Sequence, residues 1–281
     1  MLSYRHSYHA GNHADVLKHL VLVQLLRYLG QKDKGFQIVD THAGAGLYAL
    51  DSEHASKLEE HNGGIARLWD RKDLPPAVAE YVAEVRALNN GGALQSYPGS
   101  PWLSHRALRE QDRLRLFELH STDYRTLANY FNHLGGKQTI VYADDGFAHL
   151  KALLPPPTRR GLVLIDPSYE LKEDYGRVLG VLRECLERFA TGTYAVWYPM
   201  LPKLEATVLP ERLVKIGAAN WLHVTLSVRK AATDGGMHGS GMFVINPPWT
   251  LAQTLKAEMP WLRDALAESD GASFTLDHVS V

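Results

Sequence analysis

The apolar residues of the chain fall into short continuous runs, separated by stretches in which apolar and polar residues repeat with helical spacing. Continuous apolar runs of this length predict strands that are buried on both faces, as in a parallel sheet. They occupy residues 36–41, 113–119, 139–143, 161–165, 193–198, 221–229 and 242–246. No helical pattern separates the last two, so they should pair directly. The pattern predicts an α/β, Rossmann-like fold with a seven-stranded, mostly parallel sheet closed by one antiparallel strand.

The helix starts are marked by local signals. Asn12 is a favourable N-cap for an apolar helix that ends at Gly30. Ser100 followed by Pro101 places an N-cap and a proline at the first turn of another helix.

Residues 51–97 interrupt the alternation of strands and helices. They are mostly polar, with an amphipathic helical pattern at 77–88, and the segment is longer than an ordinary connection between a strand and a helix. We therefore expect residues 1–50 and 98–281 to form the Rossmann-like domain, with an N-terminal segment that contacts substrate. Residues 51–97 should form a small helical insertion subdomain.

Composition narrows the class of protein. Apolar residues make up 45% of the 281 residues, which is enough for a sizeable core, and no run approaches the ~18 apolar residues of a membrane span. The net charge of −1 means that any nucleic-acid surface must be local. A single cysteine, Cys185, excludes a disulfide framework. The polar N-terminus does not resemble a secretory signal, so we expect a cytoplasmic protein.

Polar groups follow four of the predicted strands. These groups are Asp40 with residues 42–46, Glu118, Asp145 with Gly146, and Asp166 with residues 167–169. Parallel strands bring their carboxyl ends to one edge of the sheet, where ligands bind in open α/β folds. An acid after the second strand is the usual acceptor for ribose hydroxyls in nucleotide-like sites. A plain Asp-Pro turn is the alternative for the fourth strand end.

Long motifs spread from Leu2 to Trp249 carry a closer resemblance. They read LSYRHSYHAGNHADVLKH, DTHAGAG, YPGSP, REQD, ELH, DGF, RRGLVLIDPSYE, FATGTYAVWYP and INPPW. With these motifs the chain is similar to the bacterial large-subunit ribosomal RNA adenine-N6 methyltransferases of the J type. The resemblance implies a class I methyltransferase fold, S-adenosylmethionine as cofactor with S-adenosylhomocysteine as product, and no metal. It implies large-subunit ribosomal RNA as partner, naked or in an early assembly intermediate, and a monomeric enzyme.

The resemblance also implies roles for particular residues. Cofactor contacts fall to His19, His42, Gly44, Ser100, Glu118, Asp145, Gly146 and Asp166. Contacts to the target adenosine or RNA fall to Tyr4, His6, Lys18 and Tyr169. The catalytic group would be Asp166, Pro167 and Tyr169.

The chemistry of that group follows from the substrate. The amine at N6 of adenine is weakly basic because its lone pair is delocalised into the ring. The Asp166 carboxylate and the Pro167 carbonyl can accept its hydrogens and point the lone pair at a methyl donor. Tyr169 would stack on the extruded base. Ser168 stands where this motif usually has a second proline, so the turn loses a restraint on φ.

Several alternatives remain open. Asn246-Pro247-Pro248-Trp249 fits the amine motif, but it follows the antiparallel strand and should face the other sheet edge. A nicotinamide oxidoreductase also uses this fold, although A-G-A-G is not its fingerprint. A non-catalytic RNA-binding relative and a DNA adenine methyltransferase are further possibilities. A metal site among the N-terminal histidines lacks a complete ligand set.

Overall fold

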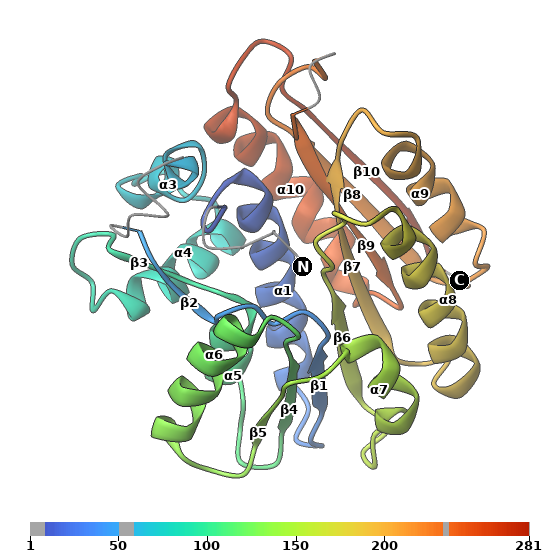
Figure 1. Ribbon diagram of the computed structural model, residues 1–281. Coiled ribbons are helices and arrows are strands. Elements are labelled where there is room, and N and C mark those ends of the chain that lie inside the picture. Colours follow the sequence, from blue (N-terminus) through green and yellow to red (C-terminus); the bar gives the residue numbers. More distant parts are fainter. Residues whose placement is uncertain (1–8, 51–58, 233–235, 281) are drawn as a thin grey trace.

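The computed structural model describes residues 9–50, 59–232 and 236–280 (Figure 1). The strands of its main sheet are β1 (Gln37–Asp40), β4 (Arg113–Phe117), β5 (Thr139–Tyr142), β6 (Gly161–Ile165), β7 (Thr193–Met200), β8 (Trp221–Ser227), β9 (Gly239–Ile245) and β10 (Ser273–Val279). They lie side by side in the order β10-β8-β9-β7-β6-β1-β4-β5. The predicted α/β class, with a mostly parallel sheet, is confirmed.

The described sheet has eight strands, one more than the seven that we predicted. Strands β1, β4, β5, β6 and β7 are parallel to their neighbours in this set, whereas β9 runs antiparallel to β7 and β8. The additional strand is β10, which pairs antiparallel with β8 at the edge. Its apolar residues alternate with polar ones, and none of its residues is fully buried. It therefore lacks the continuous apolar run by which the other strands were predicted.

Helices cover both faces of the sheet. They are α1 (His13–Gly30), α3 (Ala66–Trp69), α4 (Pro76–Leu88), α5 (Ser100–Arg106), α6 (Ser121–Leu134), α7 (Gly146–Leu153), α8 (Lys172–Arg188), α9 (Leu204–Val214) and α10 (Trp249–Leu266), with the 3-10 turn η2 (Glu60–Gly63). Figure 1 shows α1, α4, α5, α6 and α10 on one side of the sheet and α7, α8 and α9 on the other.

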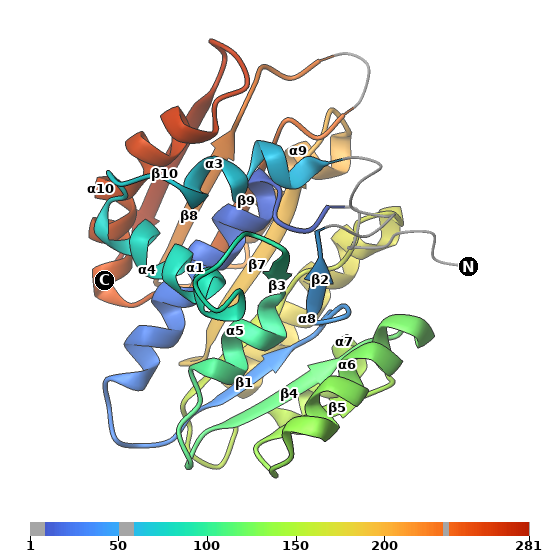
Figure 2. The same ribbon diagram turned by 90° about the vertical axis from the view of Figure 1, so that its left-hand side faces the viewer.

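The predicted insertion contains η2, α3 and α4. Two short strands flank it, β2 (Leu47–Ala49) and β3 (Ser96–Pro98), which pair with each other outside the main sheet. Figure 2 faces this side of the molecule and shows α3 and α4 outside α1. Helix α4 packs against both α1 and α10, so these elements form an outer layer over the first helix.

Helix α1 lies between this outer layer and the sheet. It is buried on almost all sides, because it packs on β9 and β7 and is covered by α4, α5 and α10. The buried set includes four polar residues, which point to a role beyond packing: His13, Asp15, Lys18 and His19. The Asn12 side chain caps the helix by accepting hydrogen bonds from the backbone N–H groups of Ala14 and Asp15. Its amide also donates to Glu60 at 2.9 Å, which ties η2 to the start of α1.

Replacing Asn12 with Ala should lower the free energy of unfolding by about 1–2 kcal/mol, because two helical N–H groups lose their acceptor. Urea denaturation followed by circular dichroism measures this change. Asn62→Ala is the matched control, since the Asn62 amide donates to Glu59 on the exposed surface and its loss should cost under ~0.5 kcal/mol. Equal effects of the two substitutions would contradict the capping role.

Candidate active site

A cavity of about 310 Å³ opens at the carboxyl ends of the parallel strands. All eight residues that we predicted to contact a cofactor line it, namely His19, His42, Gly44, Ser100, Glu118, Asp145, Gly146 and Asp166. Lys18 and Pro167 line it as well. Its size lies at the lower end of the range for small-molecule sites. The structure therefore brings residues from distant parts of the sequence into one site.

The Asp166 carboxylate is fixed by an ion pair with helix α1. The Lys18 Nζ lies 2.6 Å from one Asp166 oxygen and 2.9 Å from an oxygen of Asp15. Burial alone would lower the pKa of Lys18, but the charges of Asp15 and Asp166 raise it above its ordinary value. The lysine therefore stays charged and holds Asp166 in place. We predicted Lys18 as a substrate contact, and its amine is instead paired with two carboxylates.

Asp40 lies at the end of β1 and is completely buried. The Ser100 hydroxyl donates to it at 2.6 Å, and the His42 backbone N–H donates at 3.2 Å. Burial raises the pKa of Asp40 to about 6, although the bond from Ser100 opposes the shift. Asp40 thus lies behind the cavity wall, where its Ser100 partner is one of the lining residues.

His42 is held as a neutral ring. Burial lowers its pKa to about 4. Its Nδ1 lies 2.8 Å from the Thr41 hydroxyl, which donates its own hydrogen to the Leu164 carbonyl. Nδ1 must therefore be the donor, and Nε2 is left as an acceptor.

Glu118 follows β4 and accepts two backbone hydrogen bonds. The donors are the N–H groups of Gly44, at 2.7 Å, and His120, at 2.6 Å. Gly44 has φ +61°, and a Cβ there would come within 2.3 Å of the Tyr48 hydroxyl. Only glycine therefore allows the backbone N–H at position 44 to reach the Glu118 carboxylate. Burial raises the pKa of Glu118, and its two oriented oxygens retain free lone pairs for a ligand.

Asp145 caps helix α7 by accepting the Phe147 backbone N–H at 3.0 Å. Arg177 of α8 pairs with its other oxygen at 2.5 Å, and the guanidinium lies 4.9 Å from the centre of the Phe147 ring. Gly146 packs on β1, because a Cβ there would lie 2.5 Å from the Thr41 carbonyl oxygen. Helices α7 and α8 thus close one side of the cavity.

His19 anchors the opposite wall. Its Nδ1 lies 2.7 Å from the Tyr97 hydroxyl, which in turn lies 2.8 Å from the Tyr81 hydroxyl. This buried chain of polar contacts links α1 to β3 and α4.

Tyr169 does not line the cavity, contrary to its predicted contact with the target base. Its side chain is only 2% exposed, and its hydroxyl donates to the Trp197 carbonyl at 2.8 Å. The ring packs against Tyr175. The stacking face that we predicted is therefore covered in this structure. Two other predicted substrate contacts, Tyr4 and His6, lie outside the described residues.

The alternative motif at Asn246 lies at the other edge of the sheet. Ile245, the last residue of β9, pairs with Tyr194 near the start of β7. The Asn246 amide donates to the carbonyls of Ala190 and Gly192, both at 2.7 Å. Its donors are used within the fold, and it does not line the main cavity.

Several lining residues were not predicted from the sequence. They include Tyr48, His120, Asp123, Leu171, Asp174 and Arg177. The last three belong to the start of α8, and nothing in their local sequence indicates that this helix leans over the cavity. Tyr48 follows the A-G-A-G turn closely in the sequence, and this proximity could have identified it as a lining residue.

The described residues contain neither a candidate metal site nor a candidate membrane span. Across residues 9–50, 59–232 and 236–280, no group of three or more His, Cys, Asp or Glu side chains is placed to hold a metal ion. Within the same residues, no helix has the length and apolar character needed to cross a bilayer.

The fold and the cavity define a class. Strands β5, β4, β1, β6 and β7 form a parallel sheet, the antiparallel β9 lies between β7 and β8, and the acidic strand ends meet at one edge. This is the Rossmann-like fold of the class I methyltransferases.

Comparison with known proteins gives the family. The model of the family described as ribosomal RNA large subunit methyltransferase D, RlmJ, matches residues 33–279, so the chain belongs to this family. Ribosomal RNA large subunit methyltransferase J of Haemophilus influenzae is 47% identical over 281 residues, which cover 100% of this chain and 99% of that protein. The Escherichia coli protein of the same name is 46% identical over 279 residues, 99% of either chain. The resemblance seen in the sequence is confirmed.

A solved structure supports the fold over its whole length. A crystal structure of a Legionella pneumophila protein superposes with a TM-score of 0.88 at 37% identity, covering 97% of this chain and 99% of that chain.

Lys18→Met should destabilise the protein by about 3–5 kcal/mol at pH 7, because it leaves two carboxylates without their shared cation. Urea denaturation measures the loss. The control is Arg27→Met on the same helix, since Arg27 is 58% exposed and its pair with Glu80 should contribute under ~1 kcal/mol. Similar small losses in both variants would show that the buried pair is energetically unimportant.

The pH dependence of stability should report on Asp40. Its folded pKa of about 6 lies above the unfolded value, so the folded state binds the proton more tightly between these two values. Asp40 should therefore make wild-type protein lose stability relative to Asp40→Asn as pH rises from 4.5 to 7.5, by on the order of 2 kcal/mol. Urea denaturation of both proteins across this range measures the difference, and parallel curves would contradict it.

Proposed function

We propose that the protein is an S-adenosylmethionine-dependent methyltransferase that acts on the exocyclic N6 amine of an adenosine in large-subunit ribosomal RNA. Membership of the family and the names of the two bacterial relatives support the reaction class and the RNA substrate. The Asp166 carboxylate supports an amine as the group that accepts the methyl. Lys18 holds this carboxylate next to the Pro167 backbone in the cavity.

The residues of the cavity fit the cofactor. The Glu118 oxygens are oriented by Gly44 and His120 and can accept from ribose hydroxyls. We assign Asp145 and Gly146 to the adenine edge because they line the same cavity, and His42 offers a neutral acceptor through Nε2. Ser100, whose hydroxyl is oriented by Asp40, and His19 line the cavity and offer polar groups for the amino-acid end. Gly44 and Gly146 both line the cavity, and neither position accepts a side chain, because a Cβ would collide with Tyr48 or with the Thr41 backbone.

When bound, S-adenosylmethionine supplies a methyl group on a positively charged sulfur. The chain itself positions the amine. The Asp166 carboxylate and the Pro167 carbonyl can accept the two N6 hydrogens, which turns the nitrogen lone pair towards the methyl group. Lys18 holds the Asp166 carboxylate in position through its ion pair. Asp166 is then the nearest base for the proton that leaves the amine.

The state of the substrate is part of the proposal. The Asp166 side chain is only 12% exposed, so a target base must leave its helix or loop to reach it. Naked ribosomal RNA or an early assembly intermediate allows this extrusion more readily than RNA packed in a finished subunit. We propose a monomeric enzyme that acts in the cytoplasm, where bacterial ribosomes are assembled.

The division into domains is also a proposal. We assign residues 1–50 and 98–281 to the methyltransferase domain and residues 51–97 to a helical insertion subdomain. The support is that η2, α3 and α4 follow one another there and pack on the outside of α1.

Purified protein, labelled S-adenosylmethionine and large-subunit ribosomal RNA provide the test. Nucleoside analysis should find N6-methyladenosine, and Asp166→Asn should lower the rate at least ~100-fold, because the variant loses the charged acceptor of the amine. Circular dichroism and urea denaturation check that the variant still folds.

Asn246→Ala is the comparison variant, and it should keep the wild-type rate. Loss of transfer in Asn246→Ala alone would move the catalytic site to the other sheet edge. Binding of RNA and S-adenosylhomocysteine without any transfer by wild-type protein would instead favour a non-catalytic relative.

A further inference from the structure

We propose that Leu171 forms the apolar wall against which the target base packs, in the place that the motif gives to Tyr169. This inference rests on the proposed function and adds a substrate-contacting residue to it.

The backbone conformation at residue 169 directs the Tyr169 side chain away from the cavity. Tyr169 has φ +54°, in the left-handed region that side chains other than glycine rarely adopt. This conformation directs its ring into the core beside Tyr175, with the ring centroids 4.6 Å apart, and its hydroxyl to the Trp197 carbonyl. The buried hydroxyl and the ring contacts both hold it there, so freeing the ring would break several interactions at once.

Leu171 takes the opposite orientation. It is the N-cap residue of α8, with extended backbone angles, and its side chain is 51% exposed. It lines the same cavity as Asp166, Pro167 and Ser168. A large apolar side chain that stays half exposed inside a cavity gains free energy when a ligand covers it.

The chemistry of the neighbouring residues points to a nucleobase as the occupant. A base whose amine reaches the Asp166 carboxylate occupies the cavity that Leu171 also lines. The faces of a base are flat and apolar, whereas its edges are polar. An apolar wall next to a carboxylate acceptor matches both features.

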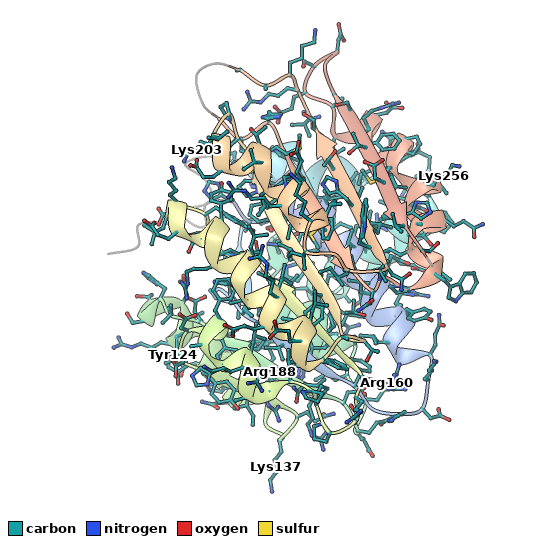
Figure 3. The ribbon with its side chains drawn as sticks, turned by 90° about the vertical axis from the view of Figure 1, so that its right-hand side faces the viewer. Tyr124, Lys137, Arg160, Arg188, Lys203 and Lys256 are labelled. Atoms are coloured by element: carbon teal, nitrogen blue, oxygen red, sulfur yellow. The ribbon has the colours of Figure 1, made fainter. Side chains whose placement is uncertain are left out.

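The start of α8, which follows Leu171, is tied to the neighbouring helix. Lys172 follows Leu171 directly and pairs with Glu205 at 2.5 Å, which joins the start of α8 to the start of α9. Figure 3 shows Lys203, the residue before α9, at one end of the α8 and α9 layer and Arg188 at the other end. Leu171 therefore stands at a helix end that is held in place by its neighbour.

The test compares Leu171→Ala with wild-type enzyme in the methyl transfer assay. We expect the KM for RNA to rise about 3–10-fold, because the base loses an apolar contact. The Kd for S-adenosylhomocysteine should stay within about 2-fold of wild type, and Leu171→Phe should restore the KM for RNA.

Leu204→Ala is the matched control. Leu204 is 71% exposed at the start of α9, close to Leu171 in the fold, but it does not line the cavity. Its substitution should leave both constants unchanged.

Three outcomes would overturn the proposal. A higher Kd for S-adenosylhomocysteine with an unchanged KM for RNA would make Leu171 a cofactor contact. Equal effects of Leu171→Ala and Leu204→Ala would indicate a general surface effect. Failure of wild-type protein to transfer methyl groups would refute the proposed function and this inference together, whereas the first two outcomes would leave the proposed function standing.

Discussion

The amine of Lys18 lies between the carboxylates of Asp15 and Asp166, and the site depends on that arrangement. The three groups are almost completely removed from water, where an unpaired charge is very costly. Because Asp15 and Lys18 belong to α1 while Asp166 ends β6, the pair fixes the helix against the edge of the sheet. The ion pairing that these buried charges require therefore also sets the position of the Asp166 carboxylate.

The other carboxylates of the cavity are oriented by their own backbone. Glu118 accepts N–H groups from two loops, Asp145 caps a helix, and Asp40 accepts the His42 N–H. Each of these bonds fixes the direction of the oxygens before any ligand arrives. A polar site that is organised in advance needs little rearrangement when charge changes during a reaction. The glycines at 44 and 146 allow this order, since a side chain at either position would meet neighbouring atoms at under 3 Å.

The sequence predicted the parts of the fold that depend on local pattern. Continuous apolar runs located the inner strands, and the groups at their ends followed, because parallel strands end at one edge. Because the strand before Asn246 was predicted to be antiparallel, Asn246 was also placed correctly at the opposite edge. Strand β10 was missed because an edge strand is only half covered and needs no continuous apolar run. The orientation of Tyr169 could not be predicted, since it depends on a single positive φ. The pairing of Lys18 with Asp166 could not be predicted either, because the two residues are 148 positions apart in the sequence.

The packing of α1 against β9 has a consequence for how the protein is made. The helix is translated first, but the strand that covers it comes from the last part of the chain. Contacts between such distant segments form only after a large loop has closed. On the ribosome, α1 can meet α4 and α5 early, but its contact with β9 forms only after residue 245 has been translated. The packing that surrounds Lys18 is therefore complete only when most of the chain has been made.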